Sequence, residues 1–141
     1  IHNRFEIPVT GIEANDKTYE EALGNKGAYR HRAKHIKAPI RLEYGPAEDY
    51  EIKSTENRFY FFNPFSIKIF RKVVNNILAS VAENPRSVDL IIYYPTALYR
   101  QFLKKNTLFE IINKAKTPGM TDKKEKFLVY RLRQDKPDGI V

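Results

Sequence analysis

Short apolar runs alternate along the chain with longer stretches in which apolar residues recur every three or four positions. This alternation predicts strands connected by helices, as in a mostly parallel sheet. The predicted strands are 7–13, 40–44, 58–62, 88–94, 109–113 and 126–133. The predicted helices run from Asp16 or Thr18 to His35, from Ser66 to Asn84, and onward from Thr96. We expect the last two strands to form an antiparallel pair, joined by a mobile loop over 114–125.

The aromatic run 58–62 is continuous rather than alternating, so we expect this strand to be buried on both faces, as strands of parallel sheets are. Right-handed crossovers would place helices on both faces of the sheet. The predicted fold class is therefore α/β, with a Rossmann-like, mostly parallel sheet and a C-terminal antiparallel strand pair. We expect residues 1–133 to form this domain and 134–141 to form a flexible tail.

Composition narrows the function classes. The 141 residues suffice for one domain. The chain has no cysteine and only three scattered histidines, which argues against disulfides, thiol nucleophiles and a metal site. No apolar run approaches the roughly 20 residues of a membrane span, and the first residues lack the pattern of a secretory leader. We therefore expect a cytoplasmic location, while the net charge of +8 favours polyanions in a general way.

Ligands of a parallel α/β sheet bind beyond the carboxyl ends of its strands. Glu13 ends the first predicted strand just before a helix, where a carboxylate can accept the two hydroxyls of a ribose. The alternative is a solvated acid near a helix N-terminus. The corners after the later strands are 45–49, 63–65 and 94–95, and each is a further candidate for ligand contact.

Asn63, Pro64 and Phe65 directly follow the aromatic strand. A side-chain amide can orient an amine or another polar substrate group, and Pro64 fixes the backbone. Phe65 could stack on a planar substrate or a cofactor ring. The alternative is a plain strand-to-helix turn, in which Phe65 packs against the helix that Ser66 caps.

Basic residues cluster late in the first long helix, where they either complement the helix C-terminus or contact RNA. They are Arg30, Arg32, Lys34 and Lys37, accompanied by His31 and His35. Motifs of other enzyme classes are absent from the sequence: there is no Gly-x-Ser-x-Gly elbow, no Walker loop and no complete Gly-x-Gly-x-x-Gly.

The segment from Val9 to Arg133 resembles class I S-adenosylmethionine-dependent methyltransferases, specifically a poorly characterised bacterial group. The phrases that carry the resemblance are VTGIE at 9–13, GPAED at 45–49 and YFFNPFS at 60–66, together with the closing antiparallel pair. The resemblance implies a seven-stranded sheet of which this chain supplies the second strand onward. The first strand and its glycine-rich loop would lie upstream of Ile1, in agreement with a start that is not Met.

The resemblance also implies roles for individual residues. Glu13 would bind the ribose hydroxyls of S-adenosylmethionine. The chain has Gly-Pro-Ala where the family often has Gly-Asp-Ala, so Glu48 or the backbone of Ala47 would hold the adenine amine. Asn63-Pro64-Phe65 resembles the Asn/Asp-Pro-Pro-aromatic motif of amino-group methyltransferases, which holds the target nitrogen. In family members with other acceptors, the residue at the position of Asn63 mainly touches the cofactor.

In the family's sheet the first strand lies between those that match 7–13 and 58–62. Without it, both strands would keep an unpaired inner edge, which is costly in backbone hydrogen bonds. We therefore expect the fragment itself to be inactive, with the missing segment supplied elsewhere, the sheet closed up, or the truncated sheet self-associated.

The sequence leaves the methyl acceptor open among RNA, protein and a small molecule. The alternative function is a non-catalytic, methyltransferase-like basic module that binds RNA or another polyanion. A nucleotide-dependent oxidoreductase is disfavoured, because the final antiparallel pair does not belong to that fold.

Overall fold

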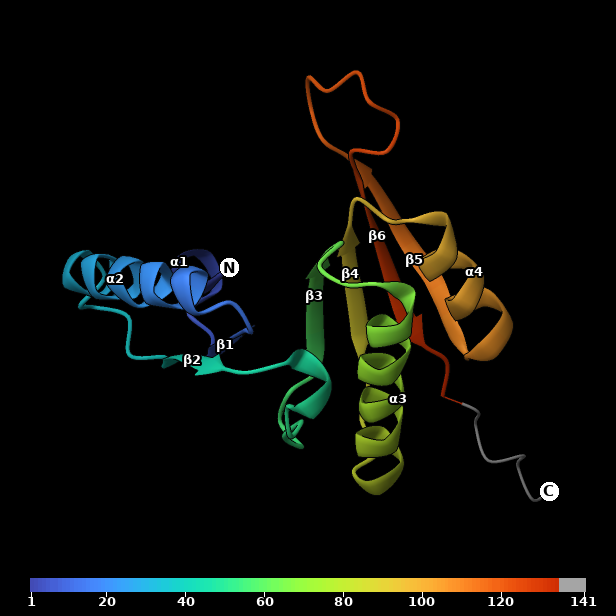
Figure 1. Cartoon of the computed structure of the whole chain (residues 1–141), viewed down its shortest axis with the longest axis horizontal. Helices are drawn as coiled ribbons and strands as arrows, with labels where there is room; N and C mark the ends of the chain where they lie inside the picture. Colours follow the sequence, from blue (N-terminus) through green and yellow to red (C-terminus); the bar gives the residue numbers. More distant parts are fainter. Residues whose placement is uncertain (135–141) are drawn as a thin grey trace. The chain divides into compact units, whose positions relative to one another are not determined.

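The computed structural model describes residues 1–134 and divides the chain into two compact units, Ile1–Glu51 and Ile52–Val141. Each unit has its own sheet and is described by itself (Figure 1). The protein is therefore a mixed α/β structure, with one fully parallel sheet and one sheet that contains both parallel and antiparallel pairs. Apart from Gln134, the predicted C-terminal tail lies outside the described residues.

The first unit contains two parallel strands. Its elements are α1 (His2–Phe5), β1 (Val9–Glu13), α2 (Asp16–Arg32), β2 (Ile40–Tyr44) and the 3-10 turn η1 (Ala47–Asp49). β1 and β2 run in register from Val9 beside Ile40 to Glu13 beside Tyr44. The parallel pairing places the carboxyl ends of the two strands at the same edge, as the sequence predicts for a βαβ unit.

The ends of α2 are set by side chains that the sequence pattern did not single out correctly. The N-cap is Asn15, whose Oδ1 accepts from the backbone N–H of Thr18 at 3.0 Å, so the prediction of Asp16 or Thr18 as cap is wrong by one residue or more. The helix ends at Arg32 rather than His35. Beyond that end, the Arg30 guanidinium donates to the carbonyls of Ile36 and Ala38 at 2.9 and 2.7 Å, so it holds the connection to β2 in place.

The second unit contains a four-stranded sheet in the order β3-β4-β6-β5. Its elements are β3 (Arg58–Phe62), α3 (Ile67–Glu83), β4 (Asp89–Tyr93), α4 (Ala97–Asn106), β5 (Phe109–Lys116) and β6 (Lys126–Leu132). β3 and β4 are parallel, and β6 runs antiparallel to both of its neighbours. The predicted closing antiparallel pair is confirmed, although β5 continues to Lys116, so the predicted connecting segment 114–125 begins three residues too early.

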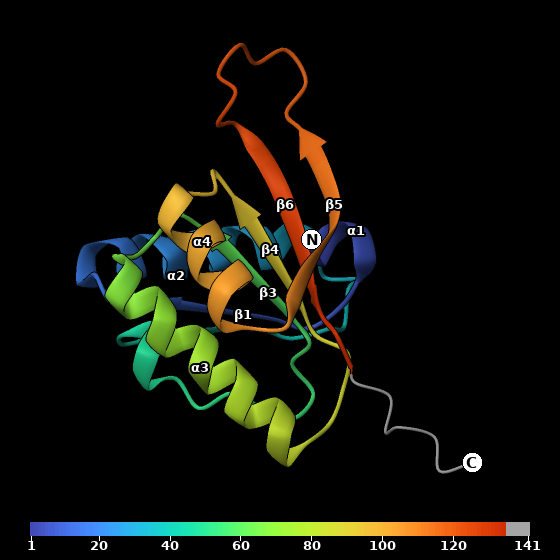
Figure 2. The ribbon, with the colours of Figure 1, turned by 90° about the vertical axis from the view of Figure 1, so that its right-hand side faces the viewer.

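α3 and α4 cover the same face of this sheet, as Figures 1 and 2 both show. The core lies between them and the strands: Phe70 of α3 stacks on Tyr99 of α4 with ring centroids 3.7 Å apart, and it meets Phe61 of β3 edge-on. The predicted caps Ser66 and Thr96 are confirmed. Fully buried side chains of this core include Phe70, Val74, Ile77, Leu90, Ile92 and Leu103.

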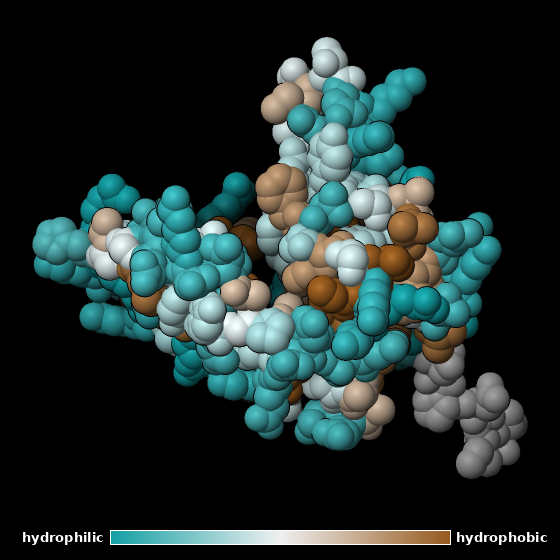
Figure 3. Space-filling model, in the orientation of Figure 1, coloured by the Kyte–Doolittle hydropathy of each residue, from teal (hydrophilic) through white to brown (hydrophobic). Residues whose placement is uncertain are grey.

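The expectation that β3 is buried on both faces is wrong for the residues that the structure describes. Phe61 is buried against α3, whereas Tyr60 and Phe62 on the other face are 50% and 61% exposed. The physical reason is that both helices of this unit lie on one face, which also corrects the prediction of helices on both faces of a single sheet. Figure 3 shows patches of apolar surface on the second unit between areas of polar surface.

Hydrogen bonding between strands is interrupted between the two units. β1 pairs only with β2, and β3 pairs only with β4, among the strands that the structure describes. Each of these two strands therefore keeps one edge without a backbone partner within residues 1–134.

Candidate functional site

A small cleft lies at the carboxyl ends of β3 and β4, within the second unit. Its volume is about 360 Å³, and its walls are Phe62, Asn63, Tyr93, Tyr94 and Glu125. Three of these side chains are aromatic, one is an amide and one is a carboxylate. The cleft thus combines apolar walls with two polar groups, which is the usual composition of a site for a small chemical group.

The backbone turns sharply at both strand ends. Asn63 has φ 39° and Tyr94 has φ 56°, so both residues are in the left-handed region. Asparagine adopts this conformation at low cost, whereas for tyrosine it is strained. Tyr94 is held by two contacts: its N–H donates to the carbonyl of Lys126 at 3.1 Å, and its hydroxyl donates to Asp122 Oδ2 at 2.7 Å.

Tyr99 holds the Asn63-Pro64-Phe65 corner through two hydrogen bonds to the Phe65 backbone. Its buried hydroxyl accepts from the N–H of Phe65 at 3.2 Å and donates to the carbonyl of the same residue. The Phe65 ring is half-buried and meets Phe61 edge-on, with centroids 6.2 Å apart. Phe65 therefore sits at the start of α3 against the core, as in the turn-and-staple alternative, while Asn63 lines the cleft and Pro64 is exposed between them.

Two carboxylates, Glu125 and Asp122, determine the electrostatics in and beside the cleft. Glu125 Oε2 is buried with no hydrogen-bond partner among the residues that the structure describes. The hydrogen bond to Asp122 raises the pKa of Tyr94, and the backbone N–H of Lys124, followed by the Tyr94 hydroxyl, lowers the pKa of Asp122. A buried carboxylate oxygen without a donor favours a ligand that donates hydrogen bonds.

The other predicted site residues lie at one edge of the first unit. Glu13 Oε1 accepts from the N–H of Asn15 at 2.8 Å, and the Glu13 carbonyl accepts from the N–H of Gly45 at 2.9 Å. Ala47 and Glu48 follow two and three residues after Gly45 in η1 and are half-buried. The structure thus brings the end of β1 together with the segment after β2, whereas Asn63, Pro64 and Phe65 belong to the other unit.

The Asn15 contact modifies the interpretation of Glu13. The carboxylate accepts an exposed hydrogen bond in the turn that begins α2, so both interpretations of Glu13 stay open. Each carboxylate offers about four acceptor positions, and one N–H uses only one of them. Glu13 therefore retains the capacity to accept further donors at the end of β1.

Sequence reasoning missed Tyr93, Tyr99 and Glu125. Glu125 could have been found, because the predicted antiparallel pair brings the start of the last strand beside the end of β4, and the register joins Tyr93 to Phe127. Tyr99 could not, since its role depends on how α4 crosses α3. In the predicted basic cluster, Arg30 donates to two carbonyl groups of the connection that follows its own helix.

Comparison with known proteins found no relationship: no family model, no curated protein and no solved structure matches this chain. Within residues 1–134, no three His, Asp or Glu side chains are grouped so that they could hold a metal ion. In the same residues, no helix has the length and apolar character needed to cross a membrane.

Proposed function

We propose that the chain carries a class I S-adenosylmethionine-dependent methyltransferase domain from its second strand onward. The observation that carries the proposal is where hydrogen bonding between the strands is interrupted. In the family's sheet, the first strand would lie between β1 and β3. In this chain, strand pairing is interrupted at the same place, because β1 belongs to one sheet and β3 to the other. The closing pair of β5 and β6 supports the same family.

The first unit supplies the proposed cofactor contacts. The Asn15 N–H orients the Glu13 carboxylate, which has further acceptor positions for the ribose hydroxyls. Glu48 or the backbone of Ala47, in the turn after β2, would hold the adenine amine. The cofactor supplies an activated methyl group on a sulfonium.

The Asn63 cleft supplies the proposed acceptor contacts. Transfer of a methyl group by in-line attack depends mainly on holding the acceptor in place, and needs no metal ion. The Asn63 amide and the partnerless Glu125 Oε2 both favour an acceptor that donates hydrogen bonds, as an amine does. Tyr99 keeps the backbone of Phe65, two residues further along, in place.

The cofactor contact is tested by isothermal titration calorimetry, in which S-adenosylhomocysteine is titrated into the full-length protein and its Glu13 variants. Glu13→Ala removes the ribose acceptor and should weaken binding by roughly 1–3 kcal/mol. Glu13→Gln keeps an acceptor for the Asn15 N–H, so it should weaken binding while leaving the thermal midpoint nearly unchanged.

The matched control is Glu21→Ala, which removes an exposed carboxylate from α2. Its affinity should equal that of the unmodified protein. Equal affinities for Glu13→Ala and Glu21→Ala would remove Glu13 from the site. Absence of any binding in the full-length protein would contradict the proposed function itself.

The acceptor contact is tested with radiolabelled S-adenosylmethionine and separate RNA, protein and small-molecule fractions of a cell extract. The variant is Asn63→Asp, because aspartate tolerates the left-handed backbone at φ 39° but lacks the amide donors. Labelling of one fraction by the unmodified protein should fall at least tenfold in the variant, while S-adenosylhomocysteine affinity falls much less. Undiminished labelling would exclude Asn63 from acceptor binding.

A further inference from the structure

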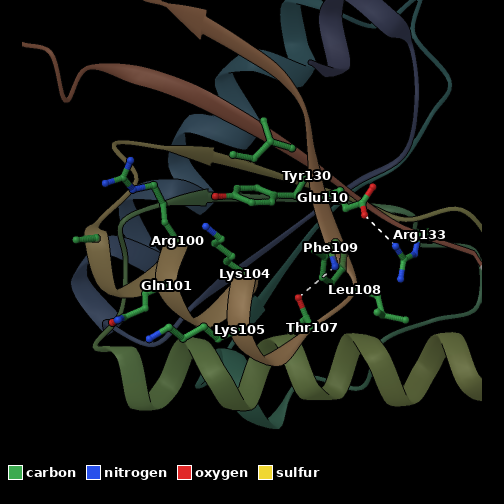
Figure 4. A pocket seen from close by; sticks show the side chains of 12 residues that line it. Arg100, Gln101, Lys104, Lys105, Thr107, Leu108, Phe109, Glu110, Tyr130 and Arg133 are labelled. Atoms are coloured by element: carbon green, nitrogen blue, oxygen red, sulfur yellow. Dashed lines mark hydrogen bonds and ion pairs between the residues drawn. The ribbon is translucent and has the colours of Figure 1, made fainter.

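A larger groove lies between α4 and β5, away from the Asn63 cleft and wholly within the second unit (Figure 4). Its volume is about 880 Å³. Its lining includes the side chains of Phe109, Ile111 and Tyr130 and four cations, Arg100, Lys104, Lys105 and Arg133.

The groove follows from the packing of α4. The helix buries Tyr99, Phe102 and Leu103 against the core, and this leaves Arg100 and Lys104 exposed on its flank, one turn apart. Residues 110–116 of β5 are all exposed, because β5 is the edge strand. The groove is therefore open to solvent along its length.

One end of the groove is closed by the turn that joins α4 to β5. The Thr107 hydroxyl donates to the Leu103 carbonyl at 2.7 Å and accepts from the N–H of Phe109 at 3.2 Å, as Figure 4 shows for the second contact. The other end reaches Ala97, three residues after Tyr94, which lines the Asn63 cleft. The open end of the groove thus points to the same edge of the sheet as the cleft.

The polar groups of the groove are mainly hydrogen-bond donors. Its one carboxylate, Glu110, is already bonded to the Arg133 guanidinium at 3.2 Å. Figure 4 shows Lys104 reaching from α4 toward the hydroxyl of Tyr130, with Arg100 one turn earlier on the same helix. Burial raises the pKa of Tyr130, with Arg100 opposing the shift, so the phenol stays protonated at neutral pH and can donate.

These features select the kind of ligand. Phosphate oxygens accept hydrogen bonds and do not donate, and a guanidinium fork matches their geometry. Exposed apolar side chains on the groove wall, Leu108 and Ile111, suit sugar and base faces better than a bare phosphate ion. The net charge of +8 adds the gain from counterion release, which grows with the number of phosphates bound.

We infer that the groove between α4 and β5 binds a single-stranded polynucleotide, with Arg100 and Lys104 on successive phosphates. The closed Thr107 end and the flanking edge strand suit one strand rather than a duplex. Binding by this groove does not depend on methyl transfer. That the bound strand also leads the methyl acceptor into the Asn63 cleft is an extension, and this extension alone rests on the proposed function.

The test measures binding of a fluorescent 12-nucleotide RNA and the matching single-stranded DNA by anisotropy, as a function of salt. The full chain carries Arg100→Glu and Lys104→Glu together, or Arg100→Gln and Lys104→Gln. The charge reversal should weaken RNA binding by about tenfold or more near physiological salt, and should lower the slope of log affinity against log salt by roughly 1.4. The Gln pair keeps a good helix former and should give a smaller loss of the same kind.

The matched control reverses Lys68 and Lys72, which are also exposed and one turn apart, but on α3 and outside the groove. It changes the net charge equally and should weaken binding less than threefold. Equal losses in both charge-reversed pairs would overturn the groove as the binding site, since only the overall charge would then matter. Preference for polyglutamate over RNA would overturn the polynucleotide as ligand in favour of an acidic protein.

Two further readouts separate this inference from the proposed function. S-adenosylhomocysteine affinity should be unchanged in the Arg100 and Lys104 variants, and RNA affinity should be unchanged in Glu13→Gln. If the Arg100 and Lys104 variants lose RNA binding while the unmodified protein binds no S-adenosylhomocysteine, the groove is supported and the proposed methyltransferase is contradicted. Equal binding of the RNA and the DNA would show that the phosphates, rather than the ribose hydroxyls, are recognised.

Discussion

The two units of the chain bury very different amounts of apolar side chain. In the second unit, both helices and all four strands contribute buried residues. In the first unit, the buried side chains among the described residues are His2, Ala33 and Ile36, and no residue of the 17-residue α2 is buried. Because most helical stability in proteins comes from packing of an apolar face, α2 gains little from its own unit.

This difference separates the two halves of the proposed site. The proposed acceptor contact, Asn63, lies on the unit with the large core, while the proposed cofactor contacts lie on the unit with the small one. A ligand that binds only the folded state stabilises it, by an amount that grows with the logarithm of ligand concentration above Kd. We therefore expect the cofactor to stabilise mainly the first unit, and core substitutions to act mainly on the second.

The largest expected effect comes from removing the central ring of the second core. Phe70 is fully buried and contacts the rings of Phe61, Tyr99 and Phe102. Phe70→Ala should lower the free energy of unfolding by about 3–5 kcal/mol, measured by urea denaturation with far-UV circular dichroism. The comparison variant is Leu23→Ala on α2, where the side chain is 42% exposed, and its cost should stay below about 0.5 kcal/mol. Similar costs for the two would contradict the difference in packing.

The next effect concerns an ion pair between neighbouring strands of the second unit. Arg131 on β6 donates two bonds, at 2.8 and 2.9 Å, to the carboxylate of Asp89 on β4, whose side chain is only 10% exposed. Arg131→Ala leaves this carboxylate without its guanidinium and should cost about 1–3 kcal/mol by the same measurement. Glu110→Ala breaks the pair with Arg133, in which both side chains are more than half exposed, and should cost less than about 0.5 kcal/mol. A reversed order would show that burial does not govern these pairs.

Helix caps give a matched pair of smaller effects, one in each unit. Ser66 caps α3 and Asn15 caps α2, each accepting from a backbone N–H. Either substitution by alanine should cost about 1 kcal/mol of local stability. Ser66→Ala should lower the urea midpoint, whereas Asn15→Ala should chiefly speed amide exchange within α2, because that helix is weakly tied to a core. Ser66→Asp and Asn15→Asp keep the cap and should restore both readouts.

The smallest effect is the pH dependence of the Tyr94–Asp122 hydrogen bond, which lies at the surface. The pKa of Asp122 is lowered in the folded chain, so its contribution is present above the ordinary value of 3.8 and is lost as pH falls through the lowered pKa. The pKa of Tyr94 is raised, so its contribution is present below the ordinary value of 10.0 and is lost as pH rises through the raised pKa. The ring resonances of Tyr94 should therefore stay constant between about pH 5 and 9. A titration step of these resonances within that range would contradict the assignment. So would an acid step that persists in Asp122→Asn.

The sequence predicts the elements of this chain well because their signals are local. Short apolar runs bounded by polar or turn residues place β2 and β3 at their observed bounds, and Ser66 and Thr96 cap the helices that they were expected to cap. The burial of β3 was predicted wrongly, since a continuous aromatic run shows that a strand is apolar but does not show which neighbours cover it. Tyr60 and Phe62 are exposed because both helices of their unit pack on the opposite face.

Some residues of the candidate site could be predicted from the sequence, and others could be found only in the tertiary structure. Glu13 and Asn63 could be selected from sequence, because each directly follows a predicted strand. The Tyr99 contact that fixes Phe65 depends on tertiary arrangement, as does the presence of Glu125 and Asn63 in one cleft. The groove under Arg100 and Lys104 is also tertiary, since it exists only where α4 meets the edge strand.

The most direct test of the methyltransferase proposal is amide hydrogen exchange of the full-length protein, followed by mass spectrometry with and without saturating S-adenosylhomocysteine. We predict slower exchange at 11–15 and 44–49, a smaller slowing at 62–65, and no change at 110–114 of β5. Glu13→Gln should lose most of this protection at the same ligand concentration. Unchanged exchange at 11–15 and 44–49 under saturation would contradict the proposal that the ends of β1 and β2 bind the cofactor.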